Sequence, residues 1–309
     1  MKPNPARLVL GLLSLLPAAA PLRGESLQLI PVADTTLFES APNDNMGGWT
    51  HVSAGTTGSQ GDRTRNRGLF QFDVASALPA GAQITNVTVD FTVVLTPGQA
   101  GGGSAINSTF ALHRLLPSWG EGNKLGDRGF PADPGEATWN FRFFNDQPWS
   151  APGGAPGIDF AAQPSATRLI GGKATYTFGP STALRDDVQA WLDTPAANHG
   201  WLLLSQSEDR AKTARGFASR EDPDVPPRLR IEFTRATPLR IEQVAAHTNR
   251  FQFTFAAEAN RAYAVEFTAA LPAPSWSTLT RIPPGPATNI VVTDLVMPEP
   301  RFYRIKQQN

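Results

Sequence analysis

The chain has 309 residues, no cysteine, and 27 basic residues balanced by 27 acidic ones. The absence of cysteine excludes disulfide bonds, thiolate catalysis and cysteine-ligated zinc. The balanced charge creates no net field that would attract nucleic acid or an acidic membrane surface, so we expect neither as a partner.

Residues 1–24 have the pattern of a secretory signal peptide. Lys2 and Arg7 precede an apolar run over residues 8–16, and alanines follow it. The run is shorter than the roughly 18 to 20 apolar residues that a membrane helix needs. We therefore predict a protein that is secreted or held at the cell surface, without a membrane span once the signal peptide is cleaved.

Most of the remaining chain alternates apolar and polar residues as β-strands do, for example over residues 84–95 and 110–116. The exception is Ser181–Thr194, where apolar residues recur at helical spacing behind Ser181 as a cap, and a short helix is predicted. The apolar run at residues 200–205 predicts a buried strand. Together these patterns predict an all-β fold, an antiparallel, jelly-roll-like β-sandwich with one short helix.

A domain boundary is predicted near residues 235–238, so that residues 25–235 form the large domain and 236–309 a second small β-sandwich. Beyond the boundary, short strands are predicted at regular spacing. They are expected at residues 240–244, 250–255, 262–267, 276–282, 289–292 and 301–305.

A series of short motifs follows one another in the large domain. They are Ala33–Leu37, Asn43–Gly48, Arg67–Asp73, Ser118–Gly122, Ala137–Asn140, Asp187–Leu192, Asn198–Leu204 and Ser219–Glu221. In this order they resemble the DNRLRE domain, a family of secreted β-sandwich proteins that includes carbohydrate-binding module family 96. Tyr263–Phe267 and Arg301–Ile305 resemble a fibronectin type III-like module. The first resemblance implies noncatalytic glycan binding, including binding of acidic glycans, and the second implies attachment or spacing.

Arginines stand at three alternate positions, Arg63, Arg65 and Arg67. In an extended strand they share one face, where guanidinium groups can bind the carboxylates of an acidic polysaccharide. The alternative is that they protect an exposed sheet edge. Trp49 and Trp149 lie in turn-rich segments, where their rings either stack on a sugar or pin loops to the sandwich.

Asp44 and Asn45 offer the hard oxygen ligands that calcium prefers. Their spacing is not that of an EF-hand, and the same residue types are common in turns. Both interpretations of these residues therefore stay open: ligands of a structural Ca²⁺ ion, or residues of an ordinary turn.

The Ser219–Glu221 triplet precedes an alternating strand. A buried guanidinium needs its donors satisfied, so we expect Arg220 to pair with Glu221 in a closed structural network. Asp34 or Asp73 is the expected third member.

The serine-hydrolase, zinc-protease and phosphate-loop patterns are absent from the sequence, and we expect no catalytic activity. The leading hypothesis is a secreted protein that binds a polysaccharide or another cell-envelope component. The first alternative is a structural or adhesive surface or matrix protein without a defined glycan ligand. The second is a polysaccharide-active enzyme.

Overall fold

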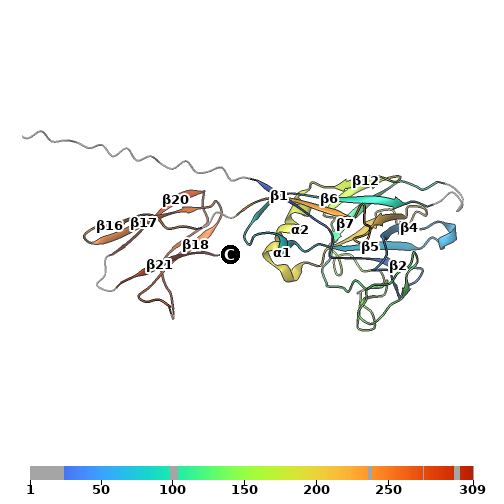
Figure 1. Ribbon diagram of the computed structural model, residues 1–309, viewed down its shortest axis with the longest axis horizontal. Helices are drawn as coiled ribbons and strands as arrows, with labels where there is room; N and C mark the ends of the chain where they lie inside the picture. The colour runs from blue at the N-terminus through green and yellow to red at the C-terminus, as the bar shows by residue number, and fades with distance from the viewer. Residues whose placement is uncertain (1–23, 98–103, 236–238, 274, 296–299, 309) are drawn as a thin grey trace, which may run out of the picture. The chain divides into compact units, whose positions relative to one another are not determined.

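A computed structural model describes residues 24–97, 104–235, 239–273, 275–295 and 300–308 of the chain (Figure 1). The chain divides into two compact units, Met1–Ala236 and Thr237–Asn309. The segment expected to be a signal peptide lies outside the described residues except for Gly24. No helix in the described ranges is long and apolar enough to cross a bilayer.

The first unit is built on one antiparallel sheet of eleven strands. Nine strands follow in the order β1-β15-β6-β14-β4-β5-β13-β7-β11, with β12 beside β6 and β2 beside β5. The strands are β1 (Glu25–Leu29), β2 (Ala33–Phe38), β4 (His51–Thr56), β5 (Arg65–Gln71), β6 (Gln83–Leu95), β7 (Ser108–Arg114), β11 (Ala166–Ile170), β12 (Thr175–Phe178), β13 (Trp201–Ser205), β14 (Arg215–Ala218) and β15 (Arg228–Thr234).

The sheet curls so that its two halves face each other as a sandwich, which confirms the predicted all-β fold. Alternate residues of β6 point inward, and the ring of Phe91 packs on that of Phe70 in β5 with centroids 4.7 Å apart. The ring of Phe217 in β14 packs on Phe110 in β7 with centroids 5.4 Å apart. These four rings are fully buried and lie in the main hydrophobic core.

The predicted short helix is α2 (Thr182–Asp193). The Ser181 hydroxyl accepts a hydrogen bond from the backbone N–H of Leu184 at 3.1 Å, which caps the helix as expected. Trp191 on its buried face packs against Trp201 of β13, with ring centroids 4.4 Å apart. The apolar stripe therefore binds the helix to the sandwich.

Strand β13 is buried along its whole length, as its apolar sequence predicts. Its Leu203 faces the main core, and Leu202 and Leu204 face a second core on the outer side of the sheet. Residues between β7 and β11 cover that outer side. Their hydrophobic residues in this second core are Leu115, Trp119, Ala137, Trp139, Trp149 and Phe160.

The covering segment carries little regular structure. It contains β8 (Phe130–Pro131), which pairs with β3 (Asp44–Asn45), and the hairpin of β9 (Phe141–Phe143) and β10 (Gln147–Pro148). The described part of the unit also contains α1 (Val74–Ala77) and the 3₁₀ turns η1 (Ser59–Gly61) and η3 (Pro195–Ala197).

The second unit has two three-stranded sheets, β16-β17-β20 and β19-β18-β21. Six strands were expected, and each overlaps an observed one. The strands are β16 (Glu242–Ala246), β17 (Arg250–Ala257), β18 (Ala262–Thr268), β19 (Ser277–Ile282), β20 (Thr288–Leu295) and β21 (Phe302–Gln308). Their inward side chains, including Phe253, Phe255 and Tyr263, form a separate core.

Arg215 in β14 is 1% exposed and donates to backbone carbonyls instead of a carboxylate. Its Nε donates to Gly171 O at 2.6 Å, its Nη2 to Ile106 O at 3.0 Å, and its Nη1 to Ala214 O at 2.9 Å. These carbonyls belong to three segments that are distant in sequence. One buried cation thus fixes three loops at the end of the sandwich.

We predict that Arg215→Met lowers the free energy of unfolding by about 3 kcal/mol or more, because each buried carbonyl left without a donor costs about 1–3 kcal/mol. Urea denaturation followed by tryptophan fluorescence measures the change. The control is Arg185→Met, which removes an exposed pair with Asp186 and is expected to cost under about 1 kcal/mol. Equal effects of the two substitutions would contradict the role assigned to Arg215.

Candidate functional site

Arg65 and Arg67 lie on the same face of β5, as predicted, but both guanidinium groups are engaged within the protein. They lie over the ring of Trp139, at 5.2 and 5.5 Å from its centroid. Nε of Arg65 donates to Glu39 at 3.0 Å. Nε and Nη2 of Arg67 donate to the two carboxylate oxygens of Glu208 at 2.8 and 2.7 Å.

Arg67 is 8% exposed, and its Nη1 also donates to the carbonyls of Gly153 and Gly154 at 2.8 and 3.0 Å. It therefore ties β5 to the covering segment. The buried Arg67 guanidinium is therefore not available to an acidic glycan, whereas the Arg65 side chain is 38% exposed and paired with Glu39.

Arg63 does not share the face of the other two arginines, so the prediction of three aligned side chains is wrong at this position. Asp62 and Arg63 have positive φ angles of 54° and 55°, which turn the chain before β5 begins at Arg65. Strand alternation starts only after this turn. Arg63 is exposed.

Of the two candidate stacking tryptophans, Trp149 is buried and Trp49 is half-buried. Trp149 is 4% exposed and donates from Nε1 to the carbonyl of Thr138 at 2.9 Å, so it pins the covering segment. Trp49 is half-buried, its Nε1 is enclosed without a partner, and its ring meets His51 edge-on at 6.3 Å. The geometry favours loop-pinning over sugar stacking for Trp149.

The expected structural network contains Asp34, Arg220 and Glu221, and its fourth member is Glu121. Asp34 accepts from the backbone N–H of Arg220 at 2.7 Å and donates its own N–H to Glu121 at 2.8 Å. The Arg220 guanidinium contacts Glu121 at 2.6 Å and Glu221 at 2.9 Å.

Of the two carboxylates expected as alternatives, Asp34 is the one in the network. Asp73 is not part of it, because its carboxylate caps α1 by accepting from the N–H of Ser76 at 3.2 Å. The expectation of a closed network is wrong, since the Arg220 side chain is 37% exposed. Glu121 was missed because it stands 99 residues from Arg220 in the sequence.

Asn45 is fully buried and joins three segments. Its Nδ2 donates to the carbonyls of Glu121 and Ala137 at 2.7 and 2.9 Å, and its Oδ1 accepts from the N–H of Gly47 at 2.8 Å. The amide is therefore committed to the turn, and Asn45 does not fit a shared calcium site with Asp44. In the part of the chain that the structure describes, no three His, Cys, Asp or Glu residues are grouped to hold a metal ion.

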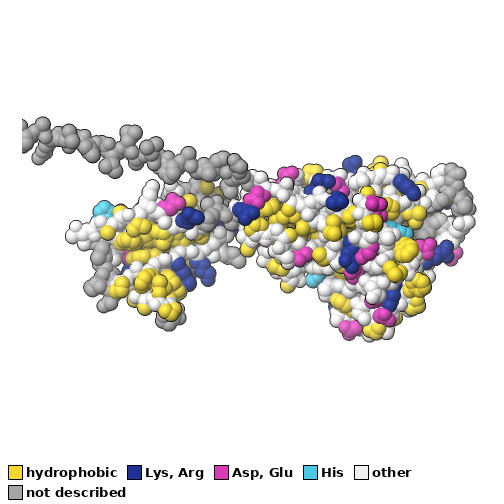
Figure 2. Space-filling view, viewed as in Figure 1, with side chains coloured by type: hydrophobic (Ala, Val, Ile, Leu, Met, Phe, Trp, Pro, Cys, Tyr) yellow, Lys and Arg dark blue, Asp and Glu magenta, His cyan; other side chains and the backbone are white. Residues whose placement is uncertain are grey.

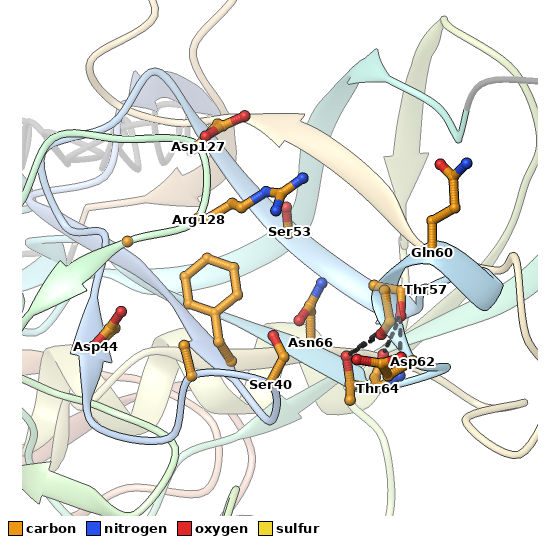
Figure 3. A pocket seen from close by; sticks show the side chains of 14 residues that line it. Ser40, Asp44, Ser53, Thr57, Gln60, Asp62, Thr64, Asn66, Asp127 and Arg128 are labelled. Carbon is orange, nitrogen blue, oxygen red and sulfur yellow. Dashed lines mark hydrogen bonds between the residues drawn. The ribbon is translucent and has the colours of Figure 1, made fainter. Parts of the chain in front are cut away.

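Asp44 instead lines a cleft of about 550 Å³ between β4, β5 and the loop at residues 126–129 (Figure 3). The short pairing of β3 with β8 holds Asp44 beside this loop. Burial raises the pKa of the Asp44 carboxyl. The lining comprises Phe38, Ser40, Ala41, Asp44, Ser53, Thr57, Gln60, Gly61, Asp62, Thr64, Asn66, Asp127, Arg128 and Gly129.

One rim of the cleft is a rigid turn. The hydroxyls of Thr57 and Thr64 both donate to the carbonyl of Gly61, at 2.6 and 2.8 Å, and the N–H of Thr64 donates back to Thr57 at 2.9 Å. Figure 3 shows these bonds and the Asp62 side chain beside them. The turn holds polar side chains in place at the rim.

Asn66 lies in the middle of the lining residues in Figure 3. It is 6% exposed, and its Oδ1 is enclosed without a hydrogen-bond partner. An unpaired buried acceptor costs about 1–3 kcal/mol, and a donor from a bound water or ligand is one way to satisfy it. A second hollow of about 340 Å³ shares Ser53, Thr57 and Asn66 with the cleft, which extends the concave surface.

Sequence patterns pointed to only one cleft residue, Asp44. The others were missed because Asp62, Asn66 and Asp127 come from segments without a common periodicity. To predict the cleft from the sequence, one would have needed to know that residues 44–45 pair with residues 130–131. Two-residue strands leave no alternation from which to predict such a pairing.

No model of a known protein family matches the chain. Among curated proteins, none gives a match.

The buried carboxyl of Asp34 leads to a prediction about how stability depends on pH. Its pKa is raised well above 3.8, mainly by burial and further by the nearby charges of Glu221 and Glu121. The hydrogen bond from the Arg220 N–H acts in the opposite direction. A raised pKa in the folded state gives stability that is present below the unfolded pKa and is lost as pH rises through the folded one. At neutral pH the ionised group is therefore a cost to the fold.

We predict that Asp34→Asn, which keeps an acceptor for the Arg220 N–H, is about 1–3 kcal/mol more stable than the unsubstituted chain at pH 7. The gain should shrink as pH falls toward about 4. Denaturant unfolding at a series of pH values measures it. Asp73→Asn is the control, since aspartate and asparagine both cap helices well. If the Asp34→Asn chain is less stable at pH 7, the Arg220 interaction outweighs burial.

Proposed function

We propose that the chain is a secreted, noncatalytic protein that binds carbohydrate at the cell surface or in the extracellular space, and that the cleft around Asn66 is its ligand site. One observation carries the proposal. The cleft combines an enclosed, unpaired amide oxygen with a lining of hydroxyl, amide and charged groups.

These groups match the chemistry of a sugar, whose many hydroxyls both donate and accept hydrogen bonds. Ser40, Ser53 and Thr64 offer hydroxyls, and the Asn66 amide offers an acceptor. A polar cleft with few apolar walls favours a polyol over a drug-like apolar ligand.

The resemblance to a family that binds acidic glycans suggested ligand carboxylates held by arginines. Arg65 and Arg67 do not support this mode of binding, because their guanidinium groups are hydrogen-bonded to Glu39 and Glu208. Acidic and basic side chains are also interspersed over the face of the first unit shown in Figure 2. The proposal therefore rests on the cleft and not on a basic surface.

Binding without bond cleavage is proposed because the sequence resembles a noncatalytic family and carries none of the catalytic motifs sought in it. The cleft does hold carboxylates, which are the groups that glycosidases use as acid and base, so the enzyme is tested directly. Release of reducing ends from a bound polysaccharide would overturn this part of the proposal and favour the enzyme.

We predict that at least one polysaccharide slows the purified chain in affinity electrophoresis across a panel of neutral, acidic and amino polysaccharides. Asn66→Ala should weaken that binding at least about tenfold, which corresponds to about 1.4 kcal/mol. It should not lower the midpoint of denaturation, because the buried Oδ1 that it removes has no partner.

The matched control is Asn289→Ala, at an exposed position of β20 in the second unit, which should bind as the unsubstituted chain does. If no polysaccharide retards the chain and it still associates with cell envelopes, the adhesive alternative replaces this proposal. If Asn66→Ala leaves the binding intact, the ligand binds outside the cleft around Asn66.

A further inference from the structure

The charges around the cleft are unequal. Asp44, Asp62 and Asp127 carry three carboxylates, and Arg128 carries one guanidinium group. The net charge of the lining at neutral pH is therefore −2, in a chain whose total formal charge is zero. A cleft that concentrates one sign of charge attracts ligands of the opposite sign.

The carboxylates surround the cleft and do not gather at one point. In Figure 3, Asp44, Asp62 and Asp127 stand on different sides of Asn66 and come from three separate segments. Within the described ranges, no group of three acidic or histidine residues is close enough to hold a metal ion. This spacing suits an extended ligand with several positive groups better than a single cation.

Asn66 gives an independent indication of what the ligand offers. Its enclosed Oδ1 is an acceptor without a donor, and the ionised carboxylates around it are acceptors too. Burial raises the pKa of Asp44. Hydroxyl and ammonium groups are both donors, and a ligand that carries both would satisfy the amide and the carboxylates together.

We propose that the cleft binds a glycan built from amino sugars, with protonated amino groups facing the carboxylates and hydroxyls facing Asn66. This inference rests on the proposed carbohydrate-binding function and names the ligand class within it. The adjoining hollow, which shares Ser53 and Thr57 with the cleft, gives room for more than one sugar unit.

The test compares three hexasaccharides with the same backbone linkage in isothermal titration calorimetry on the whole chain: one of glucosamine, one of N-acetylglucosamine and one of glucose. The glucosamine oligomer should bind at least about tenfold more tightly than either neutral one at low salt. Its advantage should fall as salt is added, because screening weakens exposed charge interactions.

Asp127→Asn with Asp62→Asn should remove most of this advantage while preserving the fold. Asp127 is exposed, and asparagine accepts the left-handed backbone of position 62 as readily as aspartate. Asp224→Asn, at an exposed position outside the cleft, is the matched control and should change nothing.

The outcomes separate the inference from the function on which it rests. If a neutral oligomer binds best and Asn66→Ala abolishes its binding, carbohydrate binding stands and the amino-sugar inference is overturned. If the glucosamine oligomer binds equally well to the Asp62/Asp127 double variant, the inference also fails. If no oligomer binds at all, both proposals fail.

Discussion

The structure of the first unit depends on covering the outer face of its sheet. Strands β5 and β13 carry apolar side chains on both faces, so the sandwich interior can bury only half of them. Leu69 and Leu202 would otherwise meet water. The irregular segment between β7 and β11 supplies Trp139 and Trp149 to cover them, and each buried aromatic removes on the order of 150–250 Å² from solvent.

Such a covering segment has few ladder hydrogen bonds, and the chain has no disulfide to hold it. Polar side chains take that role by donating to backbone carbonyls. Asn45 holds the carbonyls of residues 121 and 137, Arg67 those of 153 and 154, and Arg215 fixes loops at 106 and 171. Each buried donor satisfies acceptors that a loop cannot pair within itself.

Local sequence patterns predicted the helix and the strands in which they occur. The apolar run of β13, the capped helix behind Ser181 and the six strands of the second unit all follow from periodicity over several residues. The site was not predictable in this way. Arg63 departs from its strand because two successive positive φ angles precede β5, and Glu121 joins Arg220 through a contact that no local alternation encodes.

The alternation of side chains along β5 explains why the charge of the cleft is negative. Arg65 and Arg67 face the covering segment, where they pair with Glu39 and Glu208. These two arginines are close to the cleft residues in the sequence, but they contribute to the scaffold and not to the cleft. At alternate positions of β5, Asn66 faces the other way and lines the cleft. The carboxylates of Asp44, Asp62 and Asp127 then outnumber Arg128 on the walls. A strand that looks basic in sequence therefore borders an acidic cleft, because alternation sends its charges and its amide to opposite sides.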